Sequence, residues 1–156
     1  MSSENLSDSY LSLKILIDPI ATAMITTVRL DGKLESRPMT TQSMDTTGSL
    51  WFFTSRRSPW IRLMTGSCPV HVAYVDIGNQ LYISVSGDAT PVNDREQCRT
   101  RWTPMLFAWF PGGFDDPDIQ LVRIQIEHAD YWRSRDHIVT HLIDFPGYRS
   151  SPTMAI

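Results

Sequence analysis

Residues 50–64 read LWFFTSRRSPWIRLM and change character halfway along. Leu50–Phe53 is an uninterrupted run of large apolar side chains, which is typical of a buried β-strand. Ser58-Pro59 fits a helix start, with serine as the N-cap and proline at the first helical position. That helix should run to about Thr65 and stop at Gly66. The stretch therefore predicts a strand that leads directly into a helix.

Between the strand and the helix, Thr54–Ser58 collects three hydroxyl groups and two guanidinium groups in five residues. Hydroxyls, free backbone N–H groups and the positive end of a helix all favour an anion. Arginine adds bidentate geometry for phosphate. Neither a P-loop nor a GxGxxG fingerprint is present. Two interpretations stay open at this point: a phosphate-binding loop formed by Thr54–Ser58, or a solvated loop with a serine cap.

Alternating apolar residues and turn signals on both sides of this stretch predict a mainly antiparallel sheet. We expect helices over 4–17 and 94–102, the latter capped by Asn93 or Asp94, a hairpin turn at Asp31-Gly32, and strands over 23–28, 34–44, 50–54, 69–75, 80–89 and 121–127, the last continued to Arg133. Six antiparallel strands in a chain of this size tend to close into a barrel, because closure removes the exposed edges. Gly87, inside the fifth strand, predicts a bulge or a close approach.

The chain length and composition favour one globular domain over residues 1–156. The 156 residues are 42% hydrophobic and 20% charged, and no internal repeat or linker is visible. The core should run from about 15 to 133, followed by a tail, 134–156, without a sustained period.

The net charge and the cysteine content limit the binding partners and the cellular compartment that the protein can be expected to have. A net charge of −3 disfavours a nucleic-acid binder. No apolar run approaches the roughly 18 residues that span a membrane, and the first residues lack a basic signal region. Cys68 and Cys98 are expected to be reduced thiols in a cytoplasmic protein. His137 and His141 lie four apart, but no cysteine or carboxylate pair completes a set, so no metal site is expected.

Two more stretches are candidates for a binding site. In Arg37-Pro38-Met39-Thr40, proline cannot donate to a ladder, so the strand is an edge or is interrupted there. The backbone N–H groups of Met39 and Thr40 would then be available to a ligand, although a solvated edge arginine is the alternative. Trp109 stands shortly before Gly112-Gly113. It could be part of an aromatic core, part of a flexible lid, or a cover for a flat ligand.

Together these pieces resemble a known family, the pyridoxamine 5′-phosphate oxidase-like split-barrel flavoproteins, in the branch called general stress proteins. The resemblance is carried by SRPM within 26–39, WFFTSRRS within 50–58, YISVSG at 82–87, TPMLFAWFPGGFDDPD at 103–118, and Tyr131-Trp132. The resemblance covers residues from about 15 to 133. Each motif is weak alone, but their order and spacing are fairly specific.

The resemblance implies a six-stranded antiparallel split β-barrel that forms a homodimer, with FMN, or FAD, in a groove at the interface. It places the phosphate on Thr54, Ser55, Arg56 and Ser58, and Arg37 on the phosphate or ribityl side. The backbone around Pro38, Met39 and Thr40 would face the polar edge of the isoalloxazine, Phe53 would pack near the ring, and Trp109 would approach the flavin from the same chain or the partner.

Two departures from the family pattern narrow the expected function. Trp60 stands where many relatives carry a lysine, so one phosphate cation is replaced or missing. The arginine-rich substrate motif of the pyridoxamine phosphate oxidases proper is also missing. The expectation is an FMN-dependent oxidoreductase of unassigned small-molecule substrate. The alternatives are a flavin-binding stress or sensor module without turnover, and a split barrel that uses a deazaflavin or haem.

Overall fold

The computed structural model describes residues 3–134 and 138–144. Within them the fold is mainly β, as predicted. The elements are α1 (Ser3–Ile17), β1 (Thr22–Val28), β2 (Leu34–Met44), β3 (Ser49–Ser55), α2 (Pro59–Arg62), β4 (Cys68–Asp76), β5 (Leu81–Val92), α3 (Arg95–Arg101), the 3₁₀ turns η1 (Pro104–Ala108) and η2 (Gly113–Asp115), β6 (Ile119–Arg133) and β7 (Ile138–Asp144). Of the helices in these ranges, none combines the length and the apolar composition needed to cross a bilayer.

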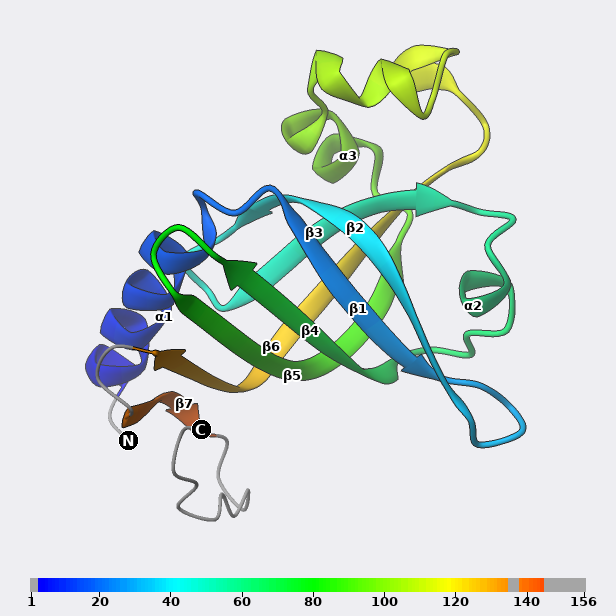
Figure 1. Ribbon diagram of the computed structural model, residues 1–156. Helices are drawn as coiled ribbons and strands as arrows, with labels where there is room; N and C mark the ends of the chain where they lie inside the picture. The colour runs from blue at the N-terminus through cyan, green and yellow to red at the C-terminus, as the bar shows by residue number, and fades with distance from the viewer. Residues whose placement is uncertain (1–2, 135–137, 145–156) are drawn as a thin grey trace.

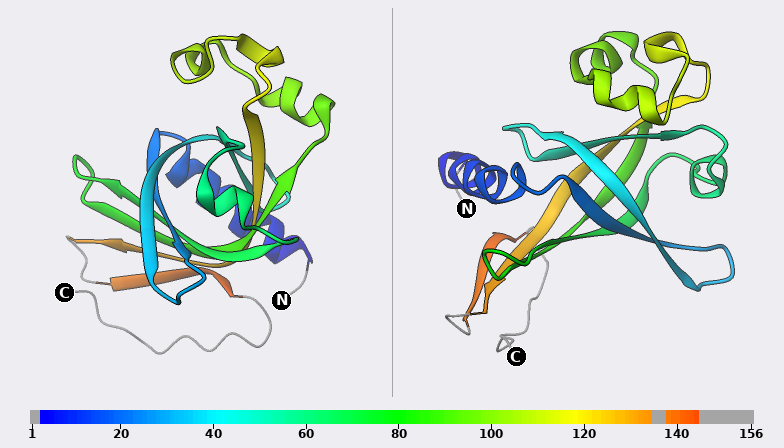
Figure 2. Two further views of the ribbon diagram at one scale, coloured as in Figure 1. Left: turned by 90° about the vertical axis from the view of Figure 1, so that its right-hand side faces the viewer. Right: turned by 45° about the horizontal axis from the view of Figure 1, so that its top comes forward.

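The strands form one antiparallel sheet that closes on itself. Its order is β3-β2-β1-β4-β5-β6-β7, and β3 pairs with β6 as well as with β2 (Figure 1). The extra pairing turns six strands into a closed barrel, which confirms the predicted fold class. The seventh strand, β7, lies outside this ring beside the second half of β6 (Figure 2).

Strand β7 lies in the segment that the sequence predicts to be an aperiodic tail. Its seven residues alternate only weakly, and it is held by the edge that β6 offers beyond the barrel. Ile138 pairs with Arg133, so β7 follows its partner closely in the sequence, but its weak alternation left the strand unpredicted.

Strand β6 is shared between two sets of neighbours. Residues 121–125 pair with both β3 and β5, whereas residues 128–133 pair with β5 and β7. The register with β5 shifts between Ser86 and Gly87. A Cβ atom on Gly87 would overlap the backbone oxygen of Gln125, so the predicted bulge and close approach are both present.

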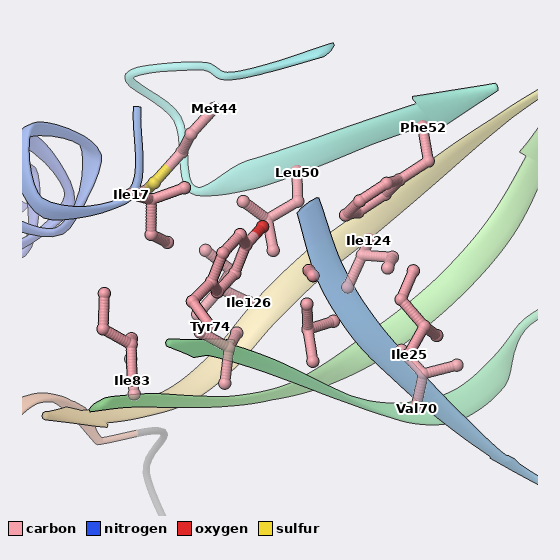
Figure 3. Packing of buried hydrophobic residues seen from close by; sticks show 14 of the residues in the cluster. Ile17, Ile25, Met44, Leu50, Phe52, Val70, Tyr74, Ile83, Ile124 and Ile126 are labelled. Atoms are coloured by element: carbon pink, nitrogen blue, oxygen red, sulfur yellow. The ribbon is translucent and has the colours of Figure 1, made fainter. Parts of the chain in front are cut away.

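The barrel interior is filled by apolar side chains from α1 and all six barrel strands. Leu13 and Ile17 bring α1 onto this core and are fully buried. Figure 3 shows Ile17 near Met44, and Tyr74 reaching into the centre beside Leu50. The Tyr74 hydroxyl lies 2.8 Å from Thr41 Oγ1, which satisfies the phenol inside the core.

Tyr74 should make the protein sensitive to high pH. Burial raises the pKa of Tyr74 far above its usual value, against the smaller opposing effect of the Thr41 hydrogen bond. The unfolded chain releases this proton near pH ~10 while the folded chain keeps it. Each pH unit above that point should therefore reduce the unfolding free energy by up to about 1.4 kcal/mol.

Urea unfolding of wild type and Tyr74→Phe between neutral and alkaline pH tests this expectation. The variant should lose stability less steeply once the pH exceeds the ordinary tyrosine pKa, because it has no phenol to ionise. Thr41→Val keeps the buried phenol and should retain the wild-type steepness. Equal slopes in wild type and Tyr74→Phe would contradict the prediction.

A second apolar cluster lies outside the barrel, between the sheet and the segment that runs from α3 to η2. Its buried members are Trp51, Phe53, Leu106, Phe110, Ile119 and Leu121. Trp102 contacts the ring of Phe53 edge-on at a centroid distance of 6.0 Å. Asp94 caps α3 by accepting from the N–H groups of Glu96 and Gln97. Figure 1 shows this segment standing above β2 and β3.

Candidate functional site

A groove of about 410 Å³ opens where β2 and β3 separate. The two strands pair from Thr41 and Phe52 onwards to Met44 and Leu50. On the other side of this point, Leu34–Thr40 pairs with β1 only, within the described chain. The stretch around Pro38 is thus an edge on its β3 side, one of the two outcomes that its proline predicts.

The groove joins an apolar wall to a polar end. Its lining residues are Thr22, Pro38, Met39, Thr40, Phe53, Thr54, Ser55, Ser58, Leu106, Trp109, Phe110 and Asp118. The apolar wall includes Phe53 and Phe110, which are buried, and Trp109, which is 66% exposed. The hydroxyl groups lie together where β3 leads into α2. Such a groove fits a ligand with a flat apolar part and a polar or anionic part.

Eight of the ten site residues predicted from the sequence line this one groove. They are Pro38, Met39, Thr40, Phe53, Thr54, Ser55, Ser58 and Trp109. The exceptions are Arg37 and Arg56. What these residues bind stays a prediction at this point, but β2, β3 and η1 bring together side chains that lie up to 71 residues apart in the chain.

Arg56 is directed to the backbone of β6. Its Nε donates to the carbonyl of Ile119 at 3.0 Å, and its backbone N–H donates to the carbonyl of Asp118 at 2.8 Å. These bonds secure the end of β3 against the start of β6. In this arrangement Arg56 is not among the residues that face the groove.

Arg37 packs beneath the indole of Trp60. Its guanidinium carbon lies 5.2 Å from the centre of that ring, and its Nη2 donates to Thr27 Oγ1 at 2.9 Å. Burial lowers the pKa of Arg37, and the nearby carboxylate of Glu35 opposes this effect. The Nη1 atom is buried without a hydrogen-bond partner. Stacking on Trp60 thus holds this cation beside the groove.

Trp60 itself faces a second groove, of about 620 Å³, on the other side of α2. This groove lies between α2 and the hairpin of β1 and β2, and its lining includes Val28, Leu30, Glu35 and Leu63 as well as Trp60. The position that many relatives fill with a lysine therefore does not line the first groove in this chain.

The helix after the polar end is shorter than predicted. Strand β3 is followed by α2, which covers only Pro59–Arg62 instead of continuing to Thr65. Ser58 occupies the N-cap position, but its side chain makes no capping bond and lies 3.3 Å from Thr54 Oγ1 instead. A single turn has a weak dipole, so an anion here would depend mainly on hydroxyl and N–H donors.

Asp118 is a groove residue that is not among the site residues predicted from the sequence. Ser55 Oγ donates to its carboxylate at 2.7 Å, and Arg57 Nε approaches it at 3.2 Å. The Ser55 hydrogen bond is the main reason that the pKa of Asp118 is lowered; burial opposes it and Arg57 adds to it. The sequence signal for Asp118 was indirect. If the barrel closes by antiparallel pairing of β3 with β6, the start of β6 must lie beside the end of β3.

Metal ligands are not gathered in the described ranges. No group of three or more histidine, cysteine or carboxylate side chains comes together there. His137 and the side chain of His141 lie outside the part of the chain that the structure describes.

A closed antiparallel barrel that separates on one side into an aromatic and hydroxyl-lined groove defines the class of split-barrel proteins. Residues 8–146 match the sequence profile of the pyridoxamine 5′-phosphate oxidase like family. The chain therefore belongs to this family, as its motifs predict.

Known relatives agree with this assignment. The crystal structure of the general stress FMN/FAD binding protein from Xanthomonas citri is 30% identical in sequence, with a TM-score of 0.67 over 85% of this chain and 90% of that one. A Clostridium acetobutylicum protein related to general stress protein 26 has a TM-score of 0.71 over 87% and 96% of the two chains, and at 18% identity it supports the fold alone. Protein bli-3 of Neurospora crassa is 29% identical over 122 residues, which are 72% of this chain and 58% of that protein.

Proposed function

We propose that the protein binds FMN in the first groove and acts as a flavin-dependent oxidoreductase of unassigned substrate. The observation that carries this proposal is the union, in one groove, of an aromatic wall and a hydroxyl-rich end. FMN has the same division between a flat ring and a phosphate. The similarity to the FMN/FAD binding protein of Xanthomonas citri supports the same ligand class.

The residues present fit this ligand. Phe53 and Trp109 would pack against the ring, and the edge strand at Pro38–Thr40 would meet its polar side. Thr54 and Ser58 would donate to the phosphate beside Ser55, whose own proton is given to Asp118. FAD is also included, because it has the same flat ring and a phosphate-bearing tail, and the Xanthomonas citri relative is described as FMN/FAD binding. The bound flavin would supply hydride or electron transfer, and the protein would bind and orient it.

The groove lining suggests no acid–base partner for the flavin. Asp118 is the single titratable side chain among the described lining residues, and Ser55 and Arg57 already engage it. This observation favours, as a second candidate, a flavin-binding stress or sensor module without turnover. Oxidation of NADH or NADPH by the flavin-loaded protein would support the oxidoreductase. If neither nicotinamide is oxidised, the flavin-binding module without turnover is favoured.

A homodimer with the flavin at the interface is part of the proposal. The turn η1 and the residue after it expose Met105, Phe107 and Trp109, which are 77%, 50% and 66% accessible. Apolar side chains gathered at the mouth of a groove are typical of a surface that a partner covers. Light scattering after size exclusion should give twice the chain mass.

The half-buried free thiols of Cys68 and Cys98 fit a reducing, cytoplasmic setting.

The first test is an absorption spectrum of the purified protein before and after incubation with excess FMN and desalting. We expect the two visible bands of oxidised flavin to remain, at about one flavin per chain. Protein that stays colourless under all loading conditions would overturn the proposal. Selective retention of a deazaflavin or haem would keep the groove as the site but replace its ligand.

A further inference from the structure

The polar end of the groove contains its own negative charge. The Asp118 side chain lines the groove and is 22% exposed. Both of its carboxylate oxygens lie 2.7 Å from Ser55 Oγ. A serine hydroxyl has a single proton to donate, so while Ser55 donates to Asp118 it has none for a ligand.

Of the three arginines near this end, Arg57 is the one that pairs with Asp118. Arg57 pairs with the carboxylate through Nε at 3.2 Å and Nη2 at 3.4 Å, and its side chain is otherwise 84% exposed. Arg56 is bonded to the Ile119 carbonyl, and Arg37 lies beneath Trp60. Asp118 is thus the charged side chain among the described lining residues, beside neutral hydroxyls, while the three arginines lie outside the lining.

The charge of the ligand tail then becomes decisive. A phosphate monoester carries about −1.5 to −2 charges at neutral pH. A riboflavin tail carries none. Repulsion between a doubly charged phosphate and a carboxylate a few ångströms away is reduced by water but remains on the order of 1 kcal/mol or more.

We propose that Asp118 is a specificity-determining residue that disfavours a doubly charged phosphate in the groove and so reduces the preference for FMN over riboflavin. This inference rests on the proposed flavin binding. The chemical class that it favours is a flavin whose tail is uncharged or singly charged, as in riboflavin or a phosphodiester-linked dinucleotide.

Asp118→Asn tests the inference because asparagine keeps the shape and removes the charge. Binding is followed by the change of flavin fluorescence as wild type and variants are titrated into FMN or riboflavin at fixed ionic strength. We expect the variant to bind FMN about tenfold more tightly than wild type does. Its riboflavin affinity should change by less than about twofold, because the tail carries no charge to repel.

Asp115→Asn is the matched control. Asp115 belongs to the same acidic segment and pairs with Arg95, but it is 79% exposed and is not a lining residue. Removal of its charge should leave the ratio of FMN to riboflavin affinity as in wild type. Asp118→Ser, which also removes the charge and supplies a hydroxyl that can accept from Ser55, replaces Asp118→Asn if that variant does not fold.

The outcomes separate this inference from the proposed function. If wild type binds both flavins and the affinity ratio stays the same in the Asp118 variants, the inference is overturned. It is also overturned if the variants lose both flavins equally, because Asp118 would then serve only to hold Ser55 and Arg57 in place. If wild type binds neither flavin, the proposed function fails, and this inference fails with it.

Discussion

Replacement of Thr54 by aspartate should weaken FMN binding by on the order of 100-fold. Thr54 lines the polar end of the groove, and its hydroxyl lies 3.3 Å from Ser58 Oγ. A carboxylate here removes one donor and adds a second negative charge next to Asp118. The phosphate of FMN would face both charges, whereas riboflavin would lose little. Flavin fluorescence titration of both ligands measures the difference directly.

Thr65→Asp provides the control for added charge. Thr65 is exposed and lines the second groove, on the far side of α2. This variant should bind FMN and riboflavin as wild type does. Equal losses of both flavins in Thr54→Asp would point to a distorted strand end instead of repulsion. An unchanged FMN affinity would mean that the phosphate does not bind between Thr54 and Ser58.

Gly87→Ala should destabilise the barrel by about 3 kcal/mol. The new methyl group would collide with the backbone of Gln125 and come within 3.1 Å of Ile124 Cγ2. Backbone atoms of a paired strand cannot move aside without breaking the ladder between β5 and β6. Urea unfolding followed by tryptophan fluorescence should show a lower midpoint with a similar slope.

Gly78→Ala is the companion variant for this measurement. A Cβ on Gly78 would meet only Asp76 Oδ1, at 3.6 Å, which is an ordinary contact. It should change stability by less than about 0.5 kcal/mol. A Gly87→Ala variant as stable as this control would show that the strands can separate at the bulge without cost.

Local patterns in the sequence are sufficient for most of the barrel. The predicted limits of the second strand coincide with β2, because the turns at Asp31-Gly32 and Asp45–Gly48 bound it on both sides. Gly87 reveals the bulge because a strand interior rarely tolerates glycine without a reason. Eight of the residues chosen by their match to the family line one groove, and their role in binding stays a prediction.

Side-chain direction is what the sequence could not supply. Arg37 and Arg56 were expected at a phosphate, yet in the structure one lies beneath Trp60 and the other is bonded to the Ile119 carbonyl. Asp118 was not assigned to the site because it lies 63 residues from Ser55, and barrel closure is what brings the two together. Each of these outcomes depends on register between distant strands, which no short window of sequence contains.

The pairing of β6 with β3 has a consequence for how the chain is made. During synthesis, β3 leaves the ribosome more than sixty residues before its partner segment at 119–125. Until that segment emerges, Trp51 and Phe53 have no strand to cover the open edge beside them, and η1 lacks Ile119 and Leu121, which complete the cluster that buries its Leu106. Contacts between distant segments make such folds slow to form. The nascent barrel should therefore depend on chaperones until β6 is complete, and the groove should be among the last features to appear.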